Sequence, residues 1–192
     1  MTTTTISHAP GLTGSLTGAY VLDAAHSRVG FSARHAMVTR VRGAFNEVTG
    51  SGYFDEGDPA NSYLEVVIQA KSIDTRNSDR DAHLRSNDFL AMDEYPEITF
   101  RSTSVERAGD DTYEVTGDLT IRGVTRPVTI DLTFTGSAVD PWGNLRVGME
   151  GGTTINRKDW GVNWNAALEA GGVLVSEKVE LELEIAAVRA AP

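Results

Sequence analysis

The chain contains no cysteine among its 192 residues. This absence excludes a disulfide framework, a thiolate metal site and a cysteine nucleophile, and it is compatible with any redox compartment. A chain of this length fits one domain better than two. It can bury roughly 70% of its unfolded surface, which is enough for a core without covalent cross-links.

Long apolar runs and an excess of positive charge are also missing. No stretch reaches the ~18 apolar residues that a membrane-spanning helix needs. The formal net charge of −10 argues against nucleic acid as a partner and against general adhesion to anionic membranes. The start of the chain, MTTTTISHAPGLTGSLTG, has neither the basic region nor the apolar centre of a secretion signal. We therefore expect a disordered arm over residues 1–18, a folded domain over residues 19–190 and a cytoplasmic location.

Apolar residues recur at every second position along most of the chain. Residues 179–185 (VELELEI) and 128–135 (VTIDLTFT) alternate without exception, which predicts strands with one dry and one wet face in antiparallel sheets. Because long hairpin-linked strands lose their exposed edges on closure, we predict an all-β fold, an eight-stranded antiparallel up-and-down β-barrel. Turn signals separate the predicted strands, which span residues 20–36, 41–55, 63–73, 97–107, 112–122, 127–139, 145–155 and 173–188.

One short helical insertion is predicted between the third and fourth strands, over residues 77–92. Ser78 can cap its start, Asp81 follows three residues later, and Pro96 stops any continuation. We expect this helix to lie across one mouth of the barrel.

The segment 25–37 (AHSRVGFSARHAM) holds the residue types of a hydrolase or a metal site, but not their spacing. Neighbouring residues in a strand face opposite ways, so His26 and Ser27 cannot face each other, and no Gly-x-Ser-x-Gly turn occurs. None of the four histidines stands in a His-x-His or His-Glu-x-x-His spacing. We therefore predict no metal and no catalytic residue here, although distant Ser and Asp residues could still converge on a histidine.

A local reversal of charge is the remaining feature of this region. No acidic residue lies between Asp23 and Glu47, whereas four arginines do, at positions 28, 34, 40 and 42. A solvated strand surface paired with carboxylates of neighbouring strands explains them. A site for an anionic head group at the barrel rim, formed by Arg34, Arg40 and His35, is the sharper interpretation.

The chain contains an ordered series of short motifs. They are Asp23-Ala-Ala-His26-Ser27 followed by Phe31, Arg34-His35, Val41-Arg-Gly43-Ala-Phe45, Arg80-Asp-Ala-His83-Leu84, Asp88-Phe89-Leu90, Tyr95-Pro96, Ile98-Thr-Phe100, Gly117-Asp-Leu119-Thr-Ile121-Arg-Gly123-Val-Thr-Arg-Pro127-Val128 and Ile155-Asn-Arg157-Lys-Asp159-Trp160-Gly161. Together they resemble one family, the YceI-like family, over nearly all of residues 20–188. The resemblance implies an extended lipocalin-like barrel of eight antiparallel strands, with helical segments, that holds a long isoprenoid or similar amphiphile. Trp160 departs from the family pattern, which more often has Phe there, and this change could reshape a cavity.

We predict a barrel interior that its own side chains leave partly empty. Gly117 and Gly151 share the parity of Leu119 and Met149, so they would leave space on the inner face. The predicted head-group residues are Arg34, His35 and Arg157. The predicted tail-site residues are Phe31, Phe45, Leu64, Val66, Ile68, Phe89, Ile98, Phe100, Leu119, Ile121, Ile130, Phe134, Val147, Met149, Trp160 and Trp164.

The leading hypothesis is non-enzymatic binding, storage or transport of a polyisoprenoid or similar long-chain amphiphilic lipid. We expect no cofactor other than this ligand and no nucleic-acid partner. Transient contact with a membrane and a homodimer are both compatible with this hypothesis. Two alternatives stay open. One is an enzyme that acts on a hydrophobic substrate through His26, His35 or His83, and the other is a filled barrel that serves as a protein-interaction module.

Overall fold

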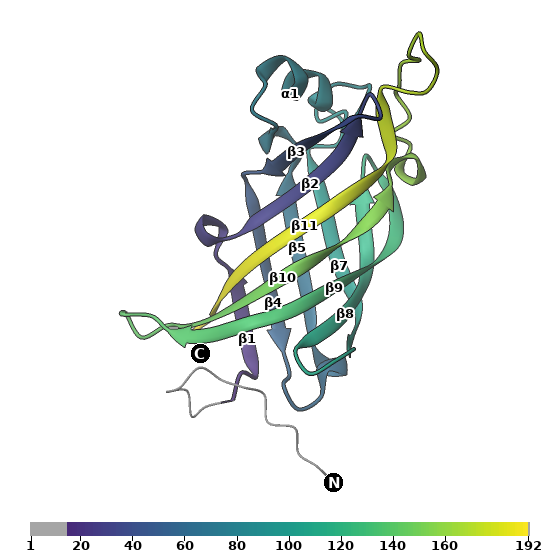
Figure 1. Ribbon diagram of the computed structural model, residues 1–192. Coiled ribbons are helices and arrows are strands. Elements are labelled where there is room, and N and C mark those ends of the chain that lie inside the picture. The colour runs from purple at the N-terminus through teal and green to yellow at the C-terminus, as the bar shows by residue number, and fades with distance from the viewer. Residues whose placement is uncertain (1–14, 192) are drawn as a thin grey trace.

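The computed structural model describes residues 15–191, and eight antiparallel strands form a closed ring in it (Figure 1). Each ring strand pairs with its neighbours in the ring, and β1 pairs with β11 to close the circle. The predicted all-β, eight-stranded antiparallel barrel is therefore confirmed. The ring strands, in order around it, are β1 (Gly18–Leu22), β4 (Val48–Phe54), β5 (Tyr63–Gln69), β7 (Glu97–Arg107), β8 (Thr112–Ile121), β9 (Val124–Val139), β10 (Leu145–Asn156) and β11 (Val175–Arg189).

Three further strands extend the barrel at one end. These are β2 (Arg28–His35), β3 (Thr39–Phe45) and β6 (Ile73–Asp74). The long strand β11 pairs with β2 along its first half and with β1 near its end. The wall is therefore longer on this side than a simple eight-stranded ring would be.

The prediction of one unbroken strand over residues 20–36 is wrong, because the chain turns between β1 and β2. The carboxylate of Asp23 accepts a hydrogen bond from the Ala25 N–H and caps a short 3₁₀ helix, η1 (Ala24–His26). The Ser27 hydroxyl oxygen then accepts from the N–H of Ala186, at 3.0 Å. Because these side chains satisfy the backbone groups at the break, β11 can change partners there without leaving them unpaired.

The predicted strand 41–55 is likewise divided, at Asn46 and Glu47. The N–H of Asn46 donates to Ser72, and the carbonyl of Glu47 accepts from Gln69. The first half of the predicted strand, β3, pairs with β2 and β6, and the second half, β4, pairs with β1 and β5. The predicted strand 63–73 is also interrupted. Strand β5 ends at Gln69, and the chain passes through η3 (Ala70–Ser72) into β6.

The helical insertion lies between β5 and β7, as predicted, but it is shorter than the predicted 77–92. Helix α1 spans Ser78–Arg85, and its cap is Asn77 rather than Ser78, because the Asn77 side chain accepts from the Arg80 N–H. The buried carboxylate of Asp81 accepts from the N–H and hydroxyl of Thr75. These bonds hold α1 at the end of the barrel where β2 and β3 extend the wall (Figure 1).

Most of the predicted arm, residues 1–14, lies outside the described residues. Its last residues pack on the barrel, since Leu16 is 1% exposed and Gly18 pairs with Phe54. The segment between β10 and β11 contains one more 3₁₀ helix, η4 (Arg157–Trp160), and η2 (Pro59–Asn61) precedes β5. Across residues 15–191, no helix has both the length and the apolar content to cross a bilayer.

Candidate functional site

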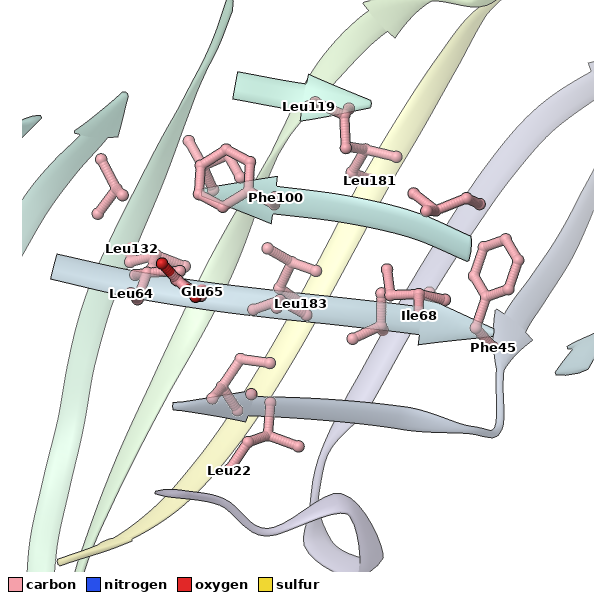
Figure 2. A pocket seen from close by; sticks show the side chains of 18 of the residues that line it. Leu22, Phe45, Leu64, Glu65, Ile68, Phe100, Leu119, Leu132, Leu181 and Leu183 are labelled. Carbon is pink, nitrogen blue, oxygen red and sulfur yellow. The ribbon is translucent and has the colours of Figure 1, made fainter. Parts of the chain in front are cut away.

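The barrel encloses a cavity of about 390 Å³, a volume within the range of ligand pockets in proteins. Its wall takes residues from all eight ring strands and from α1, η4, β2 and β3. Figure 2 shows Leu64, Leu132 and Leu183 pointing into this shared space from β5, β9 and β11. The interior is therefore not a filled core.

Strand pairing explains why these side chains share one face. Phe100 lies opposite Leu119, Leu132 pairs with Gly151, and Gly151 pairs with Leu183. Because side chains alternate along a strand, residues of the same parity in each strand all face the interior. The period of two in the sequence thus becomes a continuous apolar wall.

All the predicted tail-site residues except Trp164 line the cavity. Trp164 instead packs behind Phe89 and His83, with ring centroids 5.3 and 4.6 Å away. It supports the α1 end of the wall without bordering the cavity. Trp160 does line the cavity, and its indole N–H donates to the carbonyl of Leu119 at 2.9 Å. A role of these residues in ligand binding stays a prediction.

The prediction that Gly117 and Gly151 leave empty space on the inner face is wrong. Neither Gly117 nor Gly151 borders the cavity, because neighbouring atoms already occupy the place of their side chains. A Cβ at Gly151 would lie 1.9 Å from the Asp131 carbonyl oxygen. The inward glycines that do border the cavity are Gly50 and Gly52 of β4. Their alternation with Val48 and Phe54 was the signal in the sequence that could have identified them.

Sequence reasoning also missed almost two thirds of the residues in the wall. The clearest omission is β11, whose alternation was noted but whose residues were not placed in the site. The missed apolar and aromatic lining residues are Leu16, Tyr20, Leu22, Val29, Ala33, Tyr53, Phe54, Tyr63, Ile73, Leu84, Leu90, Val105, Tyr113, Val115, Leu132, Ile155, Val162, Val175, Val179, Leu181, Leu183, Ile185 and Ala187.

Of the three predicted head-group residues, only Arg157 borders the cavity. It is 6% exposed, and its guanidinium donates to the backbone carbonyls of Val162, Val175 and Ser176. Burial lowers the pKa of Arg157, and the charge of Glu177 opposes this shift. Arg157 therefore ties η4 to the start of β11 with a buried charge.

Arg34 and His35 lie at the exposed end of β2. Neither lines the cavity. The N–H of Arg34 donates to the Ser176 hydroxyl, and His35 pairs with Val175, so both residues adjoin the segment whose carbonyls Arg157 binds. A shared role of Arg34, His35 and Arg157 at one head group stays a prediction.

None of His26, His35 and His83 lines the cavity. His83 lies 2.8 Å from the Asp88 carboxylate on the capping segment. His26 lies 2.8 Å from the Asp23 carboxylate, and Ser27 donates its hydroxyl to the Asp23 carbonyl rather than to the imidazole. Within residues 15–191, no three His, Asp or Glu side chains converge as metal ligands.

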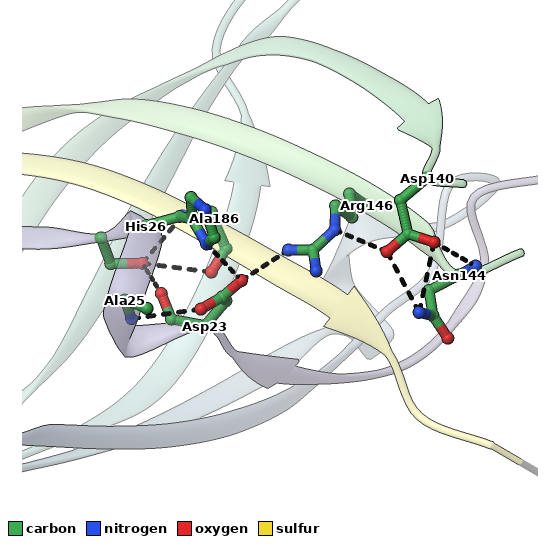
Figure 3. A network of polar contacts seen from close by, with 8 residues as sticks. Asp23, Ala25, His26, Asp140, Asn144, Arg146 and Ala186 are labelled. Atoms are coloured by element: carbon green, nitrogen blue, oxygen red, sulfur yellow. Dashed lines mark hydrogen bonds and ion pairs between the residues drawn. The ribbon is translucent and has the colours of Figure 1, made fainter. Parts of the chain in front are cut away.

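Asp23 belongs to a polar network at the other end of the barrel from α1 (Figure 3). The guanidinium of Arg146 bridges the carboxylates of Asp23, at 2.5 Å, and Asp140, at 2.9 Å. Hydrogen bonds from Arg146 and His26 lower the pKa of Asp23. The network joins the start of η1 to the β9–β10 hairpin and carries no group that faces the cavity.

Comparison with known proteins places this barrel in a family. Residues 20–187 match the family described as the YceI-like domain. The chain belongs to the YceI-like family. A UPF0312 protein of Pseudomonas aeruginosa is 40% identical over 164 residues, which cover 85% of this chain and 82% of that relative.

Solved structures share the YceI-like fold. Burkholderia cenocepacia BcnA superposes with a TM-score of 0.76 at 24% identity, over 86% of this chain and 98% of that chain. A polyisoprenoid binding domain from Saccharophagus degradans superposes with a TM-score of 0.67 at 16% identity, over 89% of this chain and 98% of that domain. At these identities the likeness extends to the fold alone.

Proposed function

We propose that this YceI-like protein binds a polyisoprenoid or a similarly long amphiphilic lipid in its barrel cavity, without catalysing a reaction on it. The observation that carries the proposal is the cavity itself, a space of about 390 Å³ inside a closed barrel. Its wall is built mainly from Leu, Ile, Val and aromatic side chains.

The two charged residues in the wall do not favour a charged occupant. Glu65 forms an ion pair with Arg101, at 3.0 Å, on a strand face where both are exposed. Arg157 is bonded to three backbone carbonyls. A hydrocarbon tail is the ligand chemistry that such a wall stabilises best, because it needs no hydrogen-bond partner.

The energetics fit a carrier rather than a permanent holder. Each CH₂ group taken from water gains ~0.8 kcal/mol. A bilayer solvates the same tail about as well as the barrel does, so transfer from membrane to protein changes the free energy little. We expect exchange to be reversible, which suits storage or transport.

Two further observations support binding without catalysis. A structural neighbour of the same fold is itself a polyisoprenoid binding domain. None of His26, His35 and His83 lines the cavity, which disfavours an enzyme that uses a cavity histidine. The cytoplasmic location, the homodimer and the absence of a cofactor stay predictions.

The test compares wild-type protein with two tryptophan variants of β11. Leu183→Trp places an indole in the middle of the cavity, whereas Glu184→Trp places the same ring on the outer face of the adjacent residue. Native mass spectrometry, with organic extraction of the bound material, measures uptake of a long-chain polyprenyl alcohol. We expect uptake by the wild type and by Glu184→Trp, and loss of uptake in Leu183→Trp.

Absence of uptake by folded wild-type protein, together with no lipid in its extract, would contradict the proposal. Equal uptake by Leu183→Trp would also contradict it, because the ligand would then sit outside the cavity.

A further inference from the structure

The β2–β3 turn exposes apolar side chains on a strained backbone. Met37 and Val38 are 63% and 77% exposed. Ala36 and Met37 both have positive φ, at 49° and 62°, in the left-handed region that Gly or Asn usually occupies in a tight hairpin. Stability of the hairpin alone does not explain this choice of residues, and strain of this kind is often kept for function.

The strands that lead to the turn present unbalanced positive charge. Arg34 lies directly opposite Arg40 in the β2–β3 register, an arrangement of like charges that costs stability. Glu180 forms an ion pair with Arg40 and contributes to the electrostatic surroundings of Arg34. Within residues 15–191, no carboxylate lies within ion-pair distance of Arg34 or Arg42.

The loop before β11 completes the apolar surface. The Met37 sulfur lies so close to Gly172 that a Cβ there would be 2.4 Å from it. Val173, next in the chain, is 41% exposed. We call Met37, Val38 and Val173 the apolar tip. Glu169 is the one acidic residue of the segment 161–174, so cations outnumber anions around the tip.

The apolar tip stands beside one end of the cavity. Ala33 of β2 lines the cavity, and so does Val175, which pairs with His35 at the base of the turn. Figure 1 places this turn at the same end of the barrel as α1, and the β9–β10 hairpin at the opposite end. That distant hairpin also carries an exposed apolar residue, Trp142 at 81%, but no free cation within residues 140–144.

We propose that the apolar tip docks this protein on bilayers that contain anionic lipids. Met37 and Val38 would enter the boundary between head groups and acyl chains, and Arg34 and Arg42 would lie against lipid phosphates. The net charge of −10 opposes the approach of the protein to an anionic bilayer. Salt screens charges beyond about 8 Å, so the groups nearest the membrane determine the electrostatic energy of docking. The inference rests on the proposed function, since it names the surface through which a lipid carrier would exchange its ligand.

Vesicle flotation tests this surface in the full chain. The vesicles contain phosphatidylcholine alone, or equal parts of phosphatidylcholine and phosphatidylglycerol. The variants are Met37→Ser with Val38→Ser, Arg34→Ser with Arg42→Ser, and Trp142→Ser as a control at the opposite end. All five replaced side chains are exposed, and circular dichroism checks that each protein folds.

We expect wild type and Trp142→Ser to float with the mixed vesicles and to bind phosphatidylcholine alone much less. The arginine pair should lower partitioning by about 10-fold or more, because each cation near an anionic surface contributes about fivefold. The Met37/Val38 pair should lower it on both kinds of vesicle. No preference for anionic vesicles, unchanged binding by both pairs, or loss of binding in Trp142→Ser would each overturn the proposal.

Uptake of detergent-dispersed polyprenyl alcohol, measured on the same variants, separates this inference from the proposed function. We expect uptake to be unchanged, because no replaced side chain lines the cavity. Normal uptake without vesicle binding would refute the docking surface alone, and vesicle binding without uptake would refute the lipid cavity alone. A tip variant that changes the oligomeric state in light scattering, with no vesicle binding by the wild type, would assign the tip to a protein interface and overturn the proposal.

Discussion

The ring of Phe100 covers the backbone of Gly117 from the neighbouring strand. A Cβ at Gly117 would lie 2.5 Å from Phe100 Cζ and 2.6 Å from the Arg101 carbonyl oxygen. Phe31 covers Gly43 in the same way, since a Cβ at Gly43 would lie 2.5 Å from Phe31 Cζ. Phe100 and Phe31 both line the cavity, whereas Gly117 and Gly43 do not, so each ring takes the room that its glycine leaves.

We expect Gly117→Ala to lower the free energy of unfolding by ~1–3 kcal/mol, as overpacked core substitutions do. Urea unfolding followed by tryptophan fluorescence measures the change. Gly109→Ala is the control, because its added Cβ would meet nothing closer than 3.6 Å, and it should change stability little. Equal stability of the two variants would mean that the Phe100 ring moves away without cost.

The Asp23–Arg146–Asp140 network predicts how stability depends on acidity. Burial acts to raise the pKa of Asp140, but hydrogen bonds from Asn144, Arg146 and Trp142 outweigh it and hold the pKa at about 2. A carboxyl whose pKa is lowered by folding contributes stability above its unfolded pKa, and that stability is lost as pH falls through the folded value. The contribution should be complete at neutral pH and disappear from about pH 5 downward to pH 2.

Asp140→Asn should therefore flatten the decline of the urea midpoint between pH 5 and pH 2, because this variant has no carboxyl to protonate at that position. Asp110→Asn, in the exposed turn between β7 and β8, is the matched control and should keep the decline of the wild type. A wild-type decline in Asp140→Asn would mean that other carboxylates dominate acid unfolding.

The contacts of Arg157 predict that even the conservative substitution Arg157→Lys lowers the stability of the protein strongly. Its planar fork donates to the carbonyls of Val162, Val175 and Ser176, and an ammonium group cannot reproduce that geometry. We expect Arg157→Lys to destabilise the protein by ~2–4 kcal/mol, since buried carbonyls lose their donors. Lys178→Ala, at an exposed position on β11, should change stability little in the same denaturation experiment. A small effect of Arg157→Lys would restore Arg157 as a residue free to bind a head group.

The eight-stranded ring could be predicted because alternation of apolar residues is a local property of each strand. Residues 97–107 form β7 with the predicted bounds. The breaks at Asp23 and Asn46 could not be predicted, since they depend on partners distant in the sequence, Ala186 and Ser72. The alternation on either side of each break continues, so hydrophobic periodicity alone does not reveal a change of strand partner.

The cavity wall, like the ring of strands, could be predicted only where it depends on local alternation. Parity placed residues such as Leu119 and Met149 correctly on the inner face. Parity could not indicate that Phe100 fills the space above Gly117, because that depends on the rotamer of a side chain in another strand. It also could not separate Trp160, which borders the cavity, from Trp164, which packs behind Phe89.

The strain in the β2–β3 turn gives a last prediction, in which one substitution has opposite effects at two positions. Ala36 has φ of 49°, so Ala36→Gly relieves a left-handed conformation that costs residues with a Cβ. Ala44, in the regular part of β3, has no such strain, and Ala44→Gly only adds freedom to the unfolded chain. We expect Ala36→Gly to raise the free energy of unfolding by about 0.5 kcal/mol and Ala44→Gly to lower it by about 0.5–1 kcal/mol. Urea unfolding measures both. If Ala36→Gly destabilises the protein as Ala44→Gly does, the backbone of the turn is not strained. The positive φ angles beside Met37 and Val38 would then need no functional explanation.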